Sequence, residues 1–268
     1  MTPVDTQTQL PAALSDLGLA LSSRACERLL SHLNLIAKWN RVYNLTALRD
    51  PAEMWTHHLL DSLAAVQPLA RHALQRPAPP RPEGVQGVQD VQGTRCAPTG
   101  PAGLHVLDVG SGAGLPGVTL AIALPEVLAL ASAEVRPAAG AGRPGVLPPA
   151  VRVSCVDAVA KKAGFIRQVA AELGLSQLQA LHGRIESLKM APADVITCRA
   201  FASLADIVRL TRVHLAPGGV WMALKGAVPT DEMAALPTDI EVFHVEPLQV
   251  PHLNAQRCLV WMRPRPQP

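Results

Sequence analysis

The 268-residue sequence predicts an α/β fold, a mostly parallel seven-stranded sheet preceded by an N-terminal cap of helices. Three observations predict it. After residue 104, short apolar runs alternate with amphipathic segments, which is typical of parallel strands joined by helices. Before residue 70, apolar residues recur only at helical spacing. A glycine-rich turn follows the first strand, as in sheets that bind nucleotide-like ligands.

The composition excludes several protein classes. Apolar residues make up 49% and charged residues 17% of the chain, which suits a globular core and excludes global disorder. A net charge of +3 does not by itself indicate nucleic-acid binding, so any such surface must be a local patch. Five cysteines without a C-x-x-C pair indicate a reducing compartment rather than disulfides or zinc knuckles. With no signal peptide or membrane-spanning run, we expect a cytoplasmic monomer with no membrane partner.

The cap, residues 1–70, contains two expected helices. Residues 1–12 are polar and unpatterned, so we expect a frayed end. A first helix is expected over 22–40, and a second begins at Asp50, where proline and Glu53 follow in N-terminal helix positions. Their apolar stripes are Leu29, Leu33, Ile36 and Trp39 in the first helix, and Trp55, Leu59, Leu63 and Val66 in the second.

Two segments rich in proline and glycine interrupt the pattern. Residues 71–103 hold six prolines and five glycines, including a triplet repeat, and are predicted to be a linker or loop. Residues 136–150 hold four prolines and three glycines. With the ambiguous apolar piece 127–135, which fits a strand, a helix extension or an insertion, they form a predicted insertion around 127–150.

The remaining part, 104–268, is expected to be one α/β domain in which strands and helices alternate. Strands are expected at 104–109, 151–156, 179–182, 194–197 and 220–224, with an antiparallel pair at 241–250 and 257–262 closing one edge. Helices are expected at 116–123, 162–173 and 204–215, the last ending before a turn at Pro217-Gly218-Gly219.

The strongest motif is the turn after the first strand, from Asp108 to Gly117. Its glycines permit positive φ and close approach of a ligand to the backbone. A Walker phosphate loop is excluded because no Gly-Lys-Ser/Thr follows. Gly112 to Gly117 spell the dinucleotide pattern G-x-G-x-x-G, although the first glycine comes late after the strand. Asp108 followed by Gly110, Gly112 and Gly114 fits the S-adenosylmethionine loop of class I methyltransferases better, and a tight turn without a ligand is the remaining alternative.

A nucleoside cofactor on such a sheet also needs a carboxylate at the end of the second strand, where it accepts the ribose hydroxyls. Asp157 fits this position, because it follows a predicted strand and precedes Lys161-Lys162 and a clean helix. Glu134 is the rival, since it lies at about the usual distance beyond the glycine loop.

Several ordered strings together resemble one family, the ribosomal RNA small subunit methyltransferase G family, also called GidB. The resemblance runs from about residue 21 to residue 262, interrupted by the two Pro/Gly-rich segments. The strings are Trp39-Asn40, Tyr43-Asn44-Leu45-Thr46, Arg49-Asp50-Pro51, His58, Asp61-Ser62-Leu63, Asp108-Val109-Gly110-Ser111-Gly112-Ala113-Gly114-Leu115-Pro116-Gly117 and Arg199-Ala200-Phe201-Ala202-Ser203-Leu204.

The resemblance implies a class I (Rossmann-like) methyltransferase fold and a defined reaction. The family transfers a methyl group from S-adenosyl-L-methionine to N7 of guanine 527, in the 530 loop of bacterial 16S rRNA in the small ribosomal subunit. The family's cofactor contacts correspond to Gly110, Leu115, Ile185, Glu186 and Arg199, beside Asp108, Gly112 and Asp157 from the motifs above. The sequence departs from the family pattern at 127–150 and at Cys198, where serine is usual.

Two side chains suggest other chemistry. Cys198, near the expected cofactor, could act as a nucleophile in cytosine C5 methylation. We expect instead that it is a small buried residue without a chemical role. His57-His58 with Asp61 could mimic a metal pair, but adjacent histidines on a helix point to different faces, so we expect no metal. The alternative functions are a methyltransferase for another RNA or a small molecule, and a nucleotide-binding regulatory module without turnover.

An RNA-binding surface is expected around the mouth of the glycine loop, because the family's N-terminal helices fold over the sheet. Basic residues there give affinity through phosphate contacts and carry no sequence information. The candidates are Arg49, His58 and Lys225, together with Lys38, Arg41 and Arg199.

The first prediction concerns the linker. Deletion of residues 78–99 should leave folding and cofactor binding nearly unchanged, because the entropy of closing a loop depends only weakly on its length. Thermal melting and calorimetric titration with S-adenosylmethionine measure both properties. A melting midpoint lowered by tens of degrees would show that the segment packs against the core.

Overall fold

The computed structural model describes residues 6–76, 103–134 and 149–266, and these form a seven-stranded sheet covered by helices on both faces. The strand order is β3-β2-β1-β4-β5-β7-β6, in which β1 to β5 are parallel and β7 is antiparallel to both β5 and β6. This order is that of class I methyltransferases and confirms the predicted fold class. The strands are β1 (Leu104–Val109), β2 (Val151–Asp157), β3 (Leu178–His182), β4 (Ala193–Arg199), β5 (Leu215–Lys225), β6 (Ile240–Pro247) and β7 (Cys258–Pro264).

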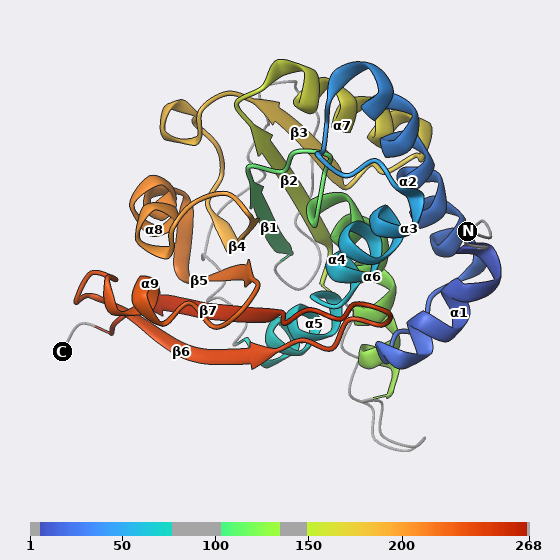
Figure 1. Cartoon of the computed structure of the whole chain (residues 1–268). Helices are drawn as coiled ribbons and strands as arrows, with labels where there is room; N and C mark the ends of the chain where they lie inside the picture. Colours follow the sequence, from blue (N-terminus) through green and yellow to red (C-terminus); the bar gives the residue numbers. More distant parts are fainter. Residues whose placement is uncertain (1–5, 77–102, 135–148, 267–268) are drawn as a thin grey trace, which may run out of the picture.

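Helices cover the two faces of the sheet unequally (Figure 1). The N-terminal helices, in blue and cyan, lie on the same side as α6, and α8 and α9 lie on the other side. The N-terminal elements are α1 (Thr6–Asp16), α2 (Ser23–Tyr43), α3 (Pro51–Met54), a π-helical turn (Trp55–Leu60), α4 (Asp61–Leu63) and α5 (Val66–Gln75). The later elements are α6 (Gly117–Glu134), α7 (Ala160–Glu172), α8 (Leu204–Thr211), α9 (Thr230–Ala234) and two 3₁₀ turns, Ile185–Ser187 and Arg212–His214.

Local sequence signals explain where the N-terminal helices begin and end. The Ser22 hydroxyl accepts a hydrogen bond from the Ala25 amide and caps α2, which ends where Asn44 adopts φ of 50°. The Asp50 carboxylate accepts the Ala52 amide and caps α3, with Pro51 in the first helical position. These observations confirm the predicted start at Asp50.

The helical cap shares its hydrophobic core with one face of the sheet. Leu29 and Ile36 of α2 and Leu63 of α4 belong to the same buried cluster as Val118 of α6 and Phe165 of α7. A second cluster fills the opposite face beneath α8. The predicted cap therefore packs as part of the methyltransferase body. In the described ranges, no helix combines the length and apolar character needed to cross a bilayer.

Three predictions about local structure were wrong, and one segment that the sequence left open is assigned by the structure. Residues 1–12 were expected to fray, but residues 6–16 form α1, because Leu10, Ala13 and Leu14 are buried against the cap. Residues 71–75 continue α5 rather than beginning the linker. The ambiguous segment is a helix extension as far as residue 134, since α6 continues through Pro125. The expected turn at Pro217-Gly218-Gly219 lies inside β5, where the register with β4 shifts. The triplet repeat and most of the second Pro/Gly-rich segment lie outside the described residues.

Candidate active site

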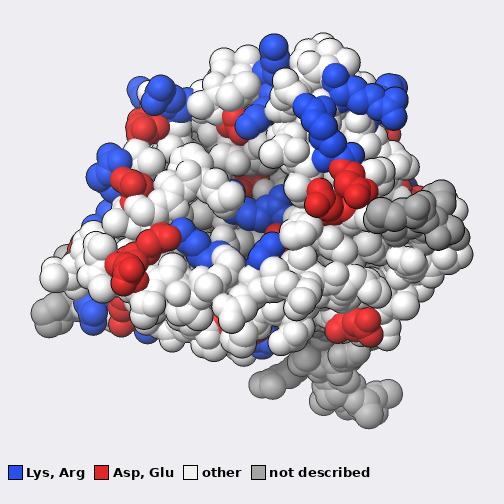
Figure 2. Space-filling view, in the orientation of Figure 1, with Lys and Arg blue, Asp and Glu red and all other residues white. Residues whose placement is uncertain are grey.

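A cavity of about 510 Å³ opens at the carboxyl edge of the sheet, beside the glycine loop that follows β1. Its walls come from the connector between α2 and α3, the π-helical turn, the ends of β4 and β5, and the loop before β7. Figure 2 shows it as a hollow near the centre of the viewed face, with Lys and Arg atoms inside. Ligands of open α/β sheets bind at this edge, so we take the cavity as the candidate active site.

The glycine loop reverses the chain sharply at the end of β1. The amides of Gly110 and Ser111 both donate to the Val156 carbonyl of β2, at 2.9 and 3.1 Å. Gly110, Gly112 and Gly114 have φ of 70°, 56° and 80°, values that residues with a Cβ rarely adopt. The predicted need for glycine is therefore confirmed by the backbone itself. Gly110, Gly112 and Leu115, three of the predicted cofactor residues, line the cavity.

Two carboxylates hold this loop from behind. Asp108 is fully buried, and its Oδ2 accepts the Gly117 amide at 2.9 Å. Burial raises the pKa of this carboxyl to about 6. Asp157, at the end of β2, accepts the Gly112 amide through Oδ2 at 2.9 Å and the Val159 amide through Oδ1 at 2.8 Å. Asp108 thus lies behind the loop rather than in the cavity wall, which corrects its predicted role as a direct cofactor contact.

Asp157, not Glu134, occupies the end of the second strand. Glu134 is the last residue of α6 and so is not at the carboxyl edge of the sheet. Asp157 remains able to bind hydroxyl groups, because a carboxylate has about four lone-pair positions and only two are used by backbone amides.

A second cavity of about 190 Å³ adjoins the first at Gly110. Ile185 and Glu186, two predicted cofactor residues, line it together with Val156 and Phe201. Its lining combines apolar residues with the carboxylate of Glu186 and the guanidinium of Arg184, a suitable environment for a planar heteroaromatic ring that carries an amino group. Because both cavities include Gly110, an elongated ligand can occupy the two together by crossing the glycine loop.

Phe201 is a component that the sequence reasoning did not single out for a role. A Cβ placed on Gly110 would overlap the Phe201 ring, so this ring lies directly on the glycine loop. Ala200 has φ of 51°, which turns the chain after β4 and directs Phe201 toward the loop. The sequence did contain a signal for Phe201. The Arg199-Ala200-Phe201 string comes at the carboxyl end of a predicted strand, and the glycine loop lies at the same edge of the sheet.

The connector between α2 and α3 is held in place by Asn40. This buried side chain donates from Nδ2 to the Leu48 carbonyl at 2.9 Å and accepts the Thr46 amide at 3.0 Å. The bonds fix the irregular segment that contributes Leu45, Thr46 and Leu48 to the cavity wall. The connector strings that carried the family resemblance therefore shape the cavity.

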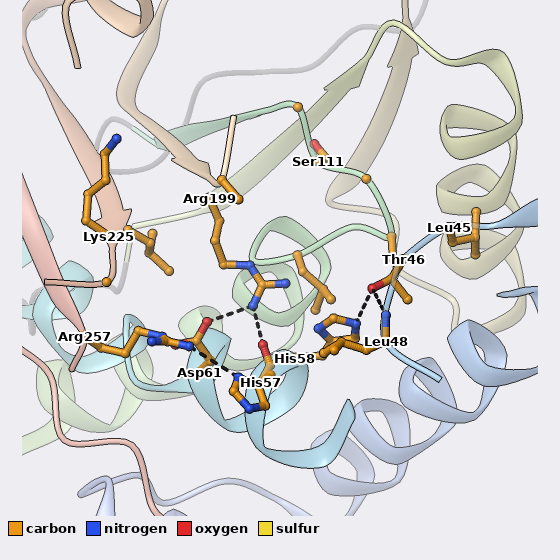
Figure 3. Close-up of a pocket in the computed structure, with 17 residues that line it drawn as sticks. Leu45, Thr46, Leu48, His57, His58, Asp61, Ser111, Arg199, Lys225 and Arg257 are labelled. Atoms are coloured by element: carbon orange, nitrogen blue, oxygen red, sulfur yellow. Dashed lines mark hydrogen bonds and ion pairs between the residues drawn. The ribbon is translucent and has the colours of Figure 1, made fainter. Parts of the chain in front are cut away.

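Arg199, at the end of β4, is held by the helical cap. Its Nη1 donates to the His57 carbonyl at 2.7 Å and to Asp61 Oδ2 at 2.9 Å. The other Asp61 oxygen, Oδ1, accepts Arg257 Nε at 2.8 Å. Figure 3 shows the two guanidinium groups converging on Asp61. The sequence singled out Asp61 through the Asp61-Ser62-Leu63 string and through its spacing from His57-His58, but not as a partner of Arg199, and it gave no signal for Arg257.

The two histidines nearest the loop are uncharged at neutral pH. Burial, with Arg199 as the second cause, lowers the pKa of His58 to about 4, and its Nε2 lies 2.9 Å from Thr46 Oγ1. Burial also lowers the pKa of His32 to about 4, and its Nε2 hydrogen-bonds the Ala113 carbonyl of the glycine loop at 2.9 Å. His58 therefore lines the cavity as a neutral, packed side chain and provides no positive charge for RNA, contrary to its predicted role.

The other predicted RNA-binding residues are only partly brought together. Lys225 lines the cavity and pairs with Glu232, Nζ to Oε2 at 2.7 Å. Arg49 is exposed outside the lining and donates to Asn44 Oδ1 at 2.8 Å. Lys38 is exposed and lines a shallow groove between α2 and α7. The predicted basic residues therefore extend beyond the mouth of the cavity.

Cys198 has the environment of a packed core residue. It is 2% exposed, and burial raises the pKa of its thiol to about 12, so it is protonated at neutral pH. A nucleophilic cysteine needs an accessible thiolate, which this environment opposes. Within the described part of the chain, no group of three His, Cys, Asp or Glu residues could hold a metal ion.

A family model and individual proteins that resemble this sequence carry the same description. The sequence matches the family described as rRNA small subunit methyltransferase G (GidB) over residues 25–75, 91–134 and 138–260. It is 52% identical to ribosomal RNA small subunit methyltransferase G of Methylibium petroleiphilum, covering 92% of this chain and 89% of that protein. It is 49% identical to the protein of the same name from Acidovorax ebreus, covering 97% and 98%. Among solved structures, TrmN from Thermus thermophilus is 20% identical with a TM-score of 0.40, covering 61% of this chain and 44% of that one.

The geometry at Asp157 generates a binding prediction. Asp157→Ala removes the acceptor of the Gly112 amide and the carboxylate at the end of β2. It should therefore weaken S-adenosylmethionine binding by about 1–3 kcal/mol. Isothermal titration calorimetry measures the loss. Asp194→Ala is the control, because Asp194 also accepts a backbone amide, that of His105, but at the opposite edge of the sheet. Wild-type affinity in the Asp157 variant would remove this residue from the binding site.

Proposed function

Because the chain belongs to the rRNA small subunit methyltransferase G family, we propose that it transfers the methyl group of S-adenosylmethionine to N7 of guanine 527 in 16S rRNA. The observation that carries the proposal is that the family match includes the strings that build the cavity, both in the glycine loop and in the helical cap. The substrate is the small ribosomal subunit, so the proposed activity is cytoplasmic.

The two adjoining cavities suit the shape of the cofactor. The adenine would occupy the smaller cavity, beside Ile185 and Glu186, and the methionine part would occupy the larger cavity, which Arg199 lines. Asp157 would accept the ribose hydroxyls. When bound, S-adenosylmethionine supplies an electrophilic methyl group on a sulfonium. Because the loop residue Gly110 has no side chain, the ligand can approach the backbone closely where the two cavities meet.

The target atom determines what the protein must do. Guanine N7 has a lone pair and no proton, so its attack on the methyl carbon needs no general base and no covalent intermediate. The residues of the cavity contribute by holding N7, methyl carbon and sulfur in line, which in well-oriented systems is worth up to about 7–11 kcal/mol. Arg199 serves this alignment, because Asp61 and the His57 carbonyl fix its guanidinium.

The RNA is held by charge around the cavity. Lys225 and Arg257 line the mouth, and Arg49 adds an exposed guanidinium nearby on the connector. Such contacts bind phosphates without reading the base, so selection of one guanine depends on the folded shape of the RNA.

The site of methylation is directly testable. Small subunits from a strain lacking the enzyme, incubated with the protein and labelled S-adenosylmethionine, should accept one methyl group at guanine 527. Mapping by chain cleavage at 7-methylguanine and primer extension locates it. Subunits from a strain that has the enzyme are the control and should accept almost none. Label at another nucleotide would refute the proposed substrate position.

The pH dependence tests the absence of proton transfer. His58, with a pKa of about 4, stays neutral between pH 6.5 and 9, and Cys198, with a pKa of about 12, stays a thiol. Asp108, with a pKa of about 6, is mostly ionised throughout this window. Single-turnover methylation of small subunits should therefore be nearly flat over the window, and Cys198→Ser should remain active. A log-linear rise with pH, or an inactive serine variant, would indicate base-assisted or covalent chemistry instead.

A further inference from the structure

We propose that Asp61 is the counter-charge that allows this strongly basic cavity to bind a cationic cofactor, and that it sets the preference for S-adenosylmethionine over the uncharged product, S-adenosylhomocysteine. The inference rests on the proposed function and assigns a role to a residue of the helical cap. It starts from an electrostatic conflict in the cavity wall.

The conflict lies in the charges that line the cavity. Among its described lining residues, three carry a positive charge, Arg199, Lys225 and Arg257, and Asp61 is the one carboxylate. The family's cofactor carries its reactive methyl on a positively charged sulfur. A cavity with this wall would repel that sulfur unless some of its positive charge were offset locally.

The three cations are offset in two different ways. Lys225 is paired with Glu232, which lies outside the lining of the cavity. Arg199 and Arg257 instead share Asp61, one on each carboxylate oxygen, at 2.9 and 2.8 Å. Figure 3 shows Lys225 directed away from this group. Asp61 therefore balances two guanidinium groups with one negative charge.

Burial makes the Asp61 charge effective. Its side chain is 6% exposed, against 18% for Arg199 and 21% for Arg257, so solvent screens the three charges poorly. The other carboxylates of the region are differently placed. Asp108 is buried behind the loop, and neither Asp108 nor Asp157 belongs to the lining of this cavity.

The reaction itself gives this charge a selective effect. As the N7–carbon bond forms and the carbon–sulfur bond breaks, the positive charge moves from sulfur to the guanine base. The product cofactor is then a neutral thioether with the same adenosine and amino-acid groups. A change in the electrostatic field of the cavity wall acts equally on the groups that the two compounds share, but it acts on a charged sulfur only in the sulfonium compound. The ratio of the two affinities reports the charge contributed by Asp61.

Three variants test the sign of the effect. Asp61→Asn keeps the size of the side chain but removes its charge, and should lower the ratio of S-adenosylmethionine to S-adenosylhomocysteine affinity about tenfold. Arg257→Gln removes a positive charge and should raise the ratio. The double variant restores the balance and should return the ratio close to that of the wild type. Calorimetric titration of the full chain with each compound measures all four ratios.

Asp194→Asn is the matched control. Asp194 also pairs with an arginine, Arg76, at 2.7 Å and is 19% exposed, but it lies at the amino end of β4, so its variant should leave the ratio unchanged. A purely structural role for Asp61 would lower both affinities equally and leave the ratio constant, which would overturn the inference. An Arg257→Gln ratio equal to or below the wild-type value would also overturn it. Failure of the wild-type protein to bind either compound would instead refute the proposed function.

Discussion

The turn that follows β1 is the constraint on which the rest of the site depends. The chain must leave a buried central strand and enter α6 within a few residues, and it does so through three glycines in left-handed conformations. The turn is held from β2 by the Val156 carbonyl and the Asp157 carboxylate, from β1 by Asp108, and from α2 by His32. These four partners come from three different elements, β1, β2 and α2, so the turn is formed only in the folded sheet.

The helical cap completes the site and is fixed to the sheet by charge as well as by apolar packing. Asp61 joins α4 to β4 through Arg199 and to the start of β7 through Arg257. The π-helical turn just before it carries His57 and His58 into the cavity wall, in keeping with the frequent occurrence of such turns at functional sites. The chain thus builds its candidate active site from segments separated by nearly 200 positions in sequence.

Much of the fold and part of the site could be predicted from the sequence. The strand β1 is buried on both faces, and four of its six residues are apolar, which is typical of a central parallel strand. The glycine turn after it could be predicted from its three alternating glycines. The helix α1 was missed because its polar residues and Pro11 give no clear apolar stripe, and its helical state depends on burying Leu10 and Leu14 against the cap. Arg257 was missed because its role arises only from a contact with Asp61, which no local pattern encodes.

The central claim is that one ligand occupies both cavities by crossing the glycine loop at Gly110. A crystal structure of the protein with S-adenosylhomocysteine tests it most directly. The account predicts adenine density between Ile185 and Phe201, the ribose hydroxyls at Asp157, and the sulfur in the larger cavity on the same side of the loop as Arg199. Density for the ligand at any other edge of the sheet, or with the adenine and amino-acid ends exchanged, would contradict it.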